Sequence, residues 1–138
     1  MHQILIIEDN EINCMIYEKI LSNDYTCLDF AYDGQEGIDK FKEKSFDLIL
    51  LDLGLPKIGG IEVARLIKEY EAAEKRLTKI PIIVITADST SATRQAALAV
   101  GVDEYLTKPF NIDQLQSMVQ HYFQEQMKKS KVAHNINL

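Results

Sequence analysis

The chain has 138 residues, a length that suits a single domain with a core of its own. Its hydrophobic content of 46% and charged content of 26% are ordinary for a soluble globular protein. The formal net charge of −6 argues against general affinity for nucleic acid or anionic membranes, and we expect neither among the partners.

The chain begins with an apolar run at residues 3–7, which is typical of a buried parallel strand, and the acidic residues Glu8 and Asp9 follow it. Apolar residues then recur at helical spacing and predict an amphipathic helix over residues 11–21. The residues that set this spacing, and so mark the apolar side of the helix, are Ile12, Met15, Ile16 and Ile20.

The rest of the chain alternates between these two patterns. Further strands are expected at residues 25–31, 47–52, 82–85 and 103–106. Further helices are expected at residues 33–44, 59–70 and 111–126, and another is expected to be capped by Ser89 or Ser91 and stopped by Gly101. Five strands that alternate with five helices predict an α/β fold, a doubly wound parallel sheet with helices on both faces.

We assign residues 1–126 to one domain, and we expect residues 127–138, which are polar and lack periodicity, to form a C-terminal tail or linker. No run approaches the roughly 20 apolar residues of a membrane span, and the N-terminus lacks a signal-peptide pattern. Cys14 and Cys27 are expected to be small core residues in a reduced environment. These features favour a cytoplasmic location.

Asp52 directly follows the apolar run at residues 48–51, and Gly54 and Pro56 come soon after it. An aspartate at the end of a buried parallel strand lies at the edge of the sheet where open α/β folds place their ligand sites. Considered alone, however, Asp52 is better explained as a residue that ends a strand or caps a turn.

Other strand ends carry reactive groups as well, and parallel strands bring all of these ends to one edge. Glu8, Asp9 and Asp52 would gather three carboxylates there, which repel one another unless a cation is present. Mg²⁺ suits such a site because it prefers oxygen ligands. Lys108 would offer a positive partner for phosphate, and Thr86 a hydroxyl for a hydrogen bond. The combination predicts a site for phosphoryl transfer to Asp52.

At this point the sequence resembles a known family, the receiver domains of two-component response regulators, over residues 3–123. The motifs that carry the resemblance are Ile-Ile-Glu-Asp-Asn at 6–10, Leu-Leu-Asp-Leu-Gly-Leu-Pro at 50–56, Ile-Thr-Ala at 85–87 and Asp-Glu-Tyr-Leu-Thr-Lys-Pro-Phe at 103–110. The resemblance implies a flavodoxin-like fold with the strand order 2-1-3-4-5.

The resemblance also implies the chemistry. Asp52 would accept a phosphoryl group from a phosphohistidine on a histidine kinase or a histidine phosphotransfer domain. Mg²⁺ would be held by Glu8, Asp9, the Asp52 carboxylate and the backbone carbonyl of Gly54. Phosphoryl acceptance and autodephosphorylation would be self-catalysed, so the chain would not be an enzyme in the ordinary sense.

By the same resemblance, Thr86 and Lys108 would contact the phosphoryl oxygens, and the Lys108–Pro109 peptide bond would be cis. Tyr105 matches the aromatic switch residue of the family. Its ring would turn inward when Thr86 moves toward the phosphoryl group. An effector protein or a second copy would then bind the face formed by the fourth helix, the fifth strand and the last helix.

Two positions depart from what is common in the family. Gly54 stands where many relatives carry a larger side chain, and Asp88 adds a negative charge close to Thr86. Both are expected to alter the lifetime of the phosphoryl bond, in a direction that the sequence leaves open.

Two other functions are alternatives for this sequence. An aspartate-nucleophile phosphatase of the haloacid dehalogenase type would need a second acid at the position of Gly54 and its nucleophile on the first strand. A flavin carrier would need a hydroxyl- and glycine-rich loop where the chain has the acidic residues 8–11. The setting stays open between a stand-alone receiver and part of a hybrid histidine kinase. The run at residues 9–13 resembles receivers of hybrid kinases and some stand-alone receivers, and it slightly favours the hybrid kinase.

Overall fold

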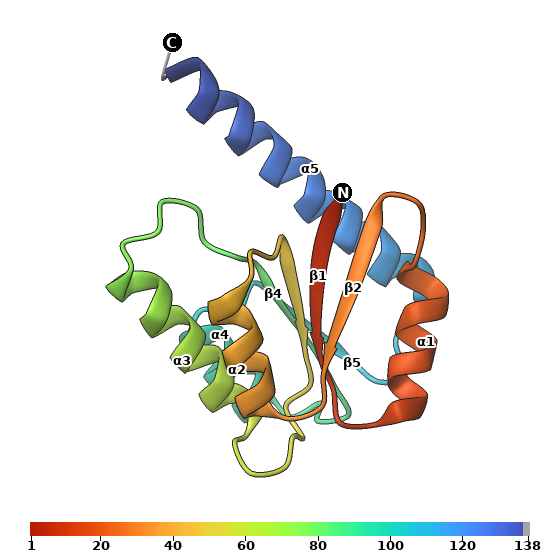
Figure 1. The fold of residues 1–138 in the computed structure, drawn as a ribbon. Coiled ribbons are helices and arrows are strands. Elements are labelled where there is room, and N and C mark those ends of the chain that lie inside the picture. The colour runs from red at the N-terminus through yellow and green to blue at the C-terminus, as the bar shows by residue number, and fades with distance from the viewer. Residues whose placement is uncertain (137–138) are drawn as a thin grey trace.

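The computed structural model describes residues 1–136 and shows a five-stranded parallel sheet between two layers of helices (Figure 1). The order of the strands is β2-β1-β3-β4-β5, as the sequence predicts for a flavodoxin-like fold. The strands are β1 (His2–Ile7), β2 (Thr26–Ala31), β3 (Leu48–Leu51), β4 (Ile82–Thr86) and β5 (Glu104–Thr107).

All five predicted helices are present. They are α1 (Glu11–Leu21), α2 (Gly34–Glu43), α3 (Gly60–Ala73), α4 (Ser91–Ala99) and α5 (Ile112–Ile136). Within the described part of the chain, no helix combines the length and the hydrophobicity that a membrane crossing requires.

The two helical layers bury both faces of the sheet. Helices α2, α3 and α4 pack against one face, and α1 and α5 pack against the other (Figure 1). Strands β3 and β4 are buried along their whole length, and β1 is buried over its last four residues. Burial on both sides explains why these strands read as continuous aliphatic runs.

The register of the strands aligns their carboxyl ends. Ile7 at the end of β1 pairs with Leu51 at the end of β3, so the residues that follow, Glu8 and Asp52, emerge side by side. Thr86 pairs with Thr107 at the ends of β4 and β5, which places Lys108 at the same edge. All the predicted site residues are thus delivered to one end of the sheet.

The apolar side that the sequence predicts for α1 was wrong for three of its four residues, while the fourth, Ile20, is half-buried and packs against the core. Ile12 and Met15 are each 68% exposed, and Ile16 is 42% exposed. The residues that α1 buries instead are Cys14, Tyr17 and Leu21. Both sets have helical spacing, so periodicity alone does not choose between them, and the packing of the helix on the sheet decides.

The predicted end of the last helix near residue 126 was also wrong, because α5 continues to Ile136. Residues 127–136 contain neither glycine nor proline, and lysine, methionine and alanine are good helix formers. Extending an existing helix is also far easier than starting one. The extension rises past the amino end of β1, away from the site edge of the sheet (Figure 1). Residues 137–138 of the predicted tail lie outside the described residues.

Two local predictions need correction as well. Thr90, rather than Ser89 or Ser91, caps α4, and its side chain accepts a hydrogen bond from the amide of Thr93. Cys14 is buried as expected, but Cys27 is exposed, because β2 forms the edge of the sheet.

Candidate functional site

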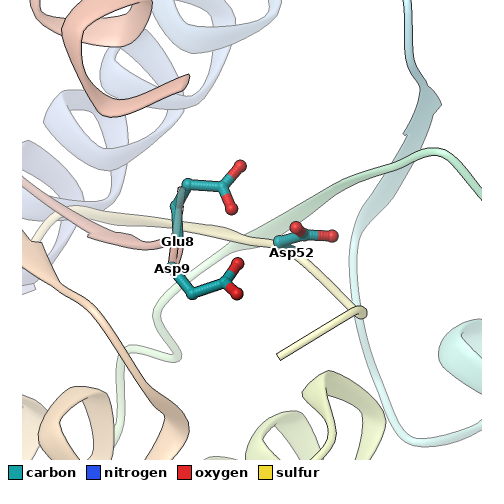
Figure 2. Close-up of side chains that lie close together, drawn as sticks. All are labelled: Glu8, Asp9 and Asp52. Carbon is teal, nitrogen blue, oxygen red and sulfur yellow. The ribbon is translucent and has the colours of Figure 1, made fainter. Parts of the chain in front are cut away.

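Three carboxylates lie together at the carboxyl edge of the sheet. Glu8 and Asp9 follow β1, and Asp52 follows β3 (Figure 2). Each offers an oxygen atom, and these three atoms all lie within 4.8 Å of one another. The convergence expected from the sequence is therefore present in the fold.

Glu8 is the most deeply buried of the three, with 1% of its surface exposed. The ammonium of Lys108 donates to its Oε1 atom at 2.8 Å and to Oδ2 of Asp52 at 3.4 Å. Burial raises the pKa of Glu8, and the nearby Asp52 carboxylate adds to the rise, while the hydrogen bond from Lys108 opposes it. The site therefore holds negative charge that a cation would stabilise.

Lys108 is fixed by the backbone on both sides. Its amide donates to the Thr86 carbonyl at 2.7 Å, and the Lys108–Pro109 peptide bond is cis. Burial lowers the pKa of Lys108, but the hydrogen bonds and charges of Glu8 and Asp52 outweigh burial, and the net pKa is raised. Lys108 accordingly stays a cation at neutral pH, aimed between two carboxylates.

The backbone around Asp52 is tightly packed. The Asp52 amide donates to the Ile7 carbonyl at 3.1 Å, which ties the residue to the neighbouring strand. At Gly60, a Cβ atom would lie 2.4 Å from the Asp52 carbonyl oxygen and 2.5 Å from Leu53 Cα. A glycine is therefore needed at the start of α3 to let that helix approach the backbone of Asp52.

Gly54, in contrast, faces open space. Its amide donates to Oδ1 of Asp52 at 3.1 Å. A Cβ atom at this position would meet only that same oxygen within 4 Å, at 3.9 Å. A larger side chain would fit here, so the glycine leaves the approach to the Asp52 carboxylate uncovered.

Thr86 and Tyr105 are linked through the backbone of Asp88. The Thr86 hydroxyl is buried and accepts from the Asp88 amide at 3.3 Å. The Tyr105 hydroxyl donates to the Asp88 carbonyl at 2.6 Å, and the residue is 8% exposed. Tyr105 is thus buried, with its hydroxyl held by the backbone of the loop that follows β4.

The Asp88 side chain is engaged at the start of α4. It accepts from the Thr90 amide at 2.9 Å, from the Thr90 hydroxyl at 2.7 Å and from the Thr93 hydroxyl at 2.9 Å. These hydrogen bonds, above all the one from the Thr90 backbone, hold the pKa of Asp88 below its usual range. Asp88 therefore fixes the loop between β4 and α4.

The donor set fits a divalent cation. With all three carboxylates ionised and Lys108 charged, the group carries three negative charges and one positive charge, a formal charge of −2. The ligand atoms on offer are oxygens, which a hard cation such as Mg²⁺ prefers. The residues therefore suit the cation that the sequence predicts.

Sequence reasoning missed the amide side chains beside this cluster. The Asn13 side chain donates from Nδ2 to Oε1 of Glu8 at 3.0 Å, and the backbone amide of Asn10 donates to Oε2 at 3.4 Å. Asn10 also caps α1, because its side chain accepts from the Asn13 amide. The available signal was the helix cap itself, which places Asn13 one turn into α1, on the side of Glu8.

A family model described as the response regulator receiver domain matches residues 4–120. Among curated relatives, the response regulator ArlR of Staphylococcus aureus is 37% identical over 135 residues, which make up 98% of this chain and 58% of ArlR. The chain thus spans little more than half the length of that relative.

Solved structures agree with the family match. One is a chain of the co-crystal structure of the Saccharomyces cerevisiae phosphotransfer protein Ypd1 with the receiver domain of Ssk1, with a TM-score of 0.79 and 33% identity, covering 88% of each chain. Another is the receiver domain of the Pseudomonas aeruginosa sensor histidine kinase PA1611, with magnesium in its active-site cleft. It has a TM-score of 0.76 and 30% identity, and the match covers 88% of this chain and 96% of that one. These matches give no support to a phosphatase of the haloacid dehalogenase type.

Proposed function

The chain belongs to the response regulator receiver domains, and from that premise we propose that Asp52 accepts a phosphoryl group from a phosphohistidine. An Asp52 carboxylate oxygen attacks phosphorus, the phosphorus–nitrogen bond breaks, and the imidazole nitrogen keeps the electron pair. Water later attacks phosphorus, the bond between phosphorus and the Asp52 oxygen breaks, and inorganic phosphate leaves, which restores the carboxylate. The Lys108 ammonium, 3.4 Å from Asp52, contacts the phosphoryl oxygens as they arrive.

Glu8, Asp9, the Asp52 carboxylate and the Gly54 carbonyl are the groups that would hold Mg²⁺. When bound, the ion would neutralise charge on the carboxylates and on the incoming phosphoryl group. The close approach of the three carboxylates supports this assignment, since among the described residues Lys108 is the cation that pairs with them and it leaves a formal charge of −2.

The convergence of these carboxylates and Lys108 on Asp52 is the observation that carries the proposal. Its test is the intact mass of the chain after incubation with phosphoramidate, a small donor with a phosphorus–nitrogen bond, in the presence of Mg²⁺. Wild type should gain the mass of one phosphoryl group, and Asp52→Asn should gain none. Wild type without Mg²⁺ should gain little. A gain of equal size in the variant would place the acceptor elsewhere.

An exposed apolar surface beside the site supports a protein as the phosphoryl donor. The surface consists of Ile12, Met15 and Ile16 of α1 together with Ile112 of α5, which is 48% exposed. We call it the α1 apolar surface. It borders an open pocket of about 470 Å³ that is lined by both Ile16 and Lys108, so it reaches the site itself. Exposed apolar groups gathered at one place commonly mark a binding surface.

A histidine phosphotransfer domain or the histidine-bearing domain of a kinase is the partner that this surface would bind. The yeast receiver in the matched co-crystal has a partner of the first kind. Replacing Ile16 with glutamate should slow phosphoryl transfer from a phosphorylated histidine phosphotransfer domain by at least about tenfold. The same variant should react normally with phosphoramidate, because the small donor needs no docking. Leu77→Glu, at an exposed residue outside this surface, is the matched control.

The output is proposed to leave through α4, β5 and α5. Thr86 and Tyr105 both bond to the backbone of Asp88, so a movement of Thr86 toward a phosphoryl group would pull on the loop that holds Tyr105. An effector protein or a second copy would read the change at this face. Tyr105→Phe removes the hydrogen bond to the Asp88 carbonyl. In this variant, phosphorylation of Asp52 should no longer change the binding of the partner to this face.

A further inference from the structure

Asn13 stands between the carboxylate cluster and the α1 apolar surface. Its side chain is half-buried, it lines the same pocket as Ile16 and Lys108, and its Nδ2 atom donates to Oε1 of Glu8 at 3.0 Å. The residue belongs to the run at 9–13, in which Asp9 is one of the carboxylates proposed to hold the cation.

The two oxygens of the Glu8 carboxylate have different surroundings. Oε1 accepts from both Asn13, at 3.0 Å, and Lys108, at 2.8 Å. Among the described residues, the hydrogen bond to Oε2 is a long one from the Asn10 amide, at 3.4 Å. Asn13 and Lys108 thus occupy one oxygen and leave the other available to a cation.

Lys108 cannot serve Glu8 alone. It also contacts Asp52 at 3.4 Å, and an incoming phosphoryl group on Asp52 would compete for the same ammonium. Glu8 has 1% of its surface exposed, so water is poorly placed to replace a lost donor. A buried carboxylate that loses its hydrogen-bond donors is costly. The amide of Asn13 is a donor with no such competing duty.

We infer that Asn13 is a positioning residue for the cation site: it holds Oε1 of Glu8 so that Oε2 stays directed to a bound divalent cation while Lys108 turns to the phosphoryl group. The inference rests on the proposed function for the phosphoryl step, but its claim about cation binding can be measured without that step. Replacing a residue that orients a metal ligand commonly lowers the affinity for the metal by about tenfold or more.

Asn13→Ala is the variant that tests the inference. Alanine is a better helix former than asparagine, and the hydrogen bond from the backbone amide of Asn13 to Asn10 remains, so α1 should keep its stability. Titration calorimetry with MgCl₂ should show an affinity about tenfold below that of wild type. The Mg²⁺ concentration that gives half the maximal rate of phosphorylation by phosphoramidate should rise by the same factor.

Two further variants complete the experiment. Asn13→Gln keeps an amide donor and should bind Mg²⁺ more tightly than Asn13→Ala does. Glu18→Ala changes an exposed residue on the same helix and should bind as wild type does. Unchanged affinity in Asn13→Ala, or a glutamine variant no better than alanine, would overturn the inference. Failure of the proposed function would look different, because wild type itself would then gain no phosphoryl group.

Discussion

Gly54 leaves the space beside the Asp52 carboxylate empty, which bears on how fast water can remove a phosphoryl group from Asp52. Water must approach an acyl phosphate on Asp52 for the phosphoryl group to be lost, and a side chain at position 54 would stand in that approach. The sequence left the direction of this effect open. From the open space at Gly54 we expect a short lifetime of the phosphoryl bond.

Gly54→Leu should lengthen the lifetime of phosphorylated Asp52 by about three- to tenfold, equivalent to roughly 0.7–1.4 kcal/mol in the barrier to hydrolysis. The measurement is the decay of the phosphorylated mass after the donor has been removed. Gly54→Ala, whose methyl group is too short to cover the carboxylate, serves as the control. Equal lifetimes for wild type and the leucine variant would show that water arrives from another side.

At the level of elements, Asp29 ties the edge strand β2 to helix α2. Its carboxylate bonds to Lys40 and Lys44, each at 2.8 Å, and its side chain is 18% exposed. Burial raises the pKa of Asp29, but the hydrogen bonds from the two lysines outweigh burial and lower it below 3.8. A pKa lowered by folding means that the ionised carboxylate stabilises the fold at any pH well above 3.8.

Asp29→Asn should therefore lower the free energy of unfolding by about 1 kcal/mol near neutral pH. The difference from wild type should shrink as the pH falls below 3.8 and the wild-type carboxyl takes up its proton. Urea unfolding measured across this range would show both effects. Asp39→Asn, on the exposed side of α2, is the control, and a pH-independent difference would contradict the ion-pair explanation.

Helix α5 is the element in which the domain boundary can be tested. Among the residues whose burial is described, up to residue 129, the helix buries Leu115, Val119 and Phe123, and Met127 is 52% exposed. We propose that the domain ends near residue 126 although the helix continues, because Phe123 is the last buried residue in that range.

A chain ended after Gln126 should keep its free energy of unfolding to within about 1 kcal/mol. Phe123→Ala in the full chain should cost about 3 kcal/mol or more, because it empties a buried position. Urea unfolding compares the two. A truncated chain as unstable as the Phe123 variant would show that residues 127–136 belong to the domain.

For the whole molecule, the acidic cluster links stability to cation binding. Mg²⁺ that binds the folded chain and not the unfolded one should raise the free energy of unfolding, by about 2.7 kcal/mol at one hundred times the dissociation constant. Removing the ion with a chelator should reverse the gain. The melting temperature at several Mg²⁺ concentrations provides the measurement.

Asp9→Asn should lose most of this stabilisation by Mg²⁺, because it removes one of the proposed ligands. The Asp9 side chain is exposed, so the substitution itself should change the free energy of unfolding little. Asp24→Asn, at an exposed carboxylate that is not part of the cluster, should keep it. Equal gains in the two variants would place the cation outside the cluster.

The sequence by itself determined the fold class and the number of elements, and it predicted that the carboxylates and Lys108 would meet at one edge of the sheet. Continuous aliphatic runs followed by Glu8, Asp52 and Thr86 are local patterns, and parallel strands must bring such ends to one edge. The motifs around these residues also indicate the family. A local pattern can be recognised without knowing what packs against it.

The tertiary structure decided which face of α1 is buried, how far α5 extends and what Asn13 contacts. The predicted set, which contains Ile12, and the buried set, which contains Cys14, both have helical spacing. Only the packing of α1 on the sheet decides which of the two is buried. The hydrogen bond from Asn13 to Glu8 joins a helix to the end of a strand. Lys108 contacts both Glu8 and Asp52, and these three residues follow three different strands. Contacts of this kind depend on distances between elements, which neither periodicity nor a motif contains.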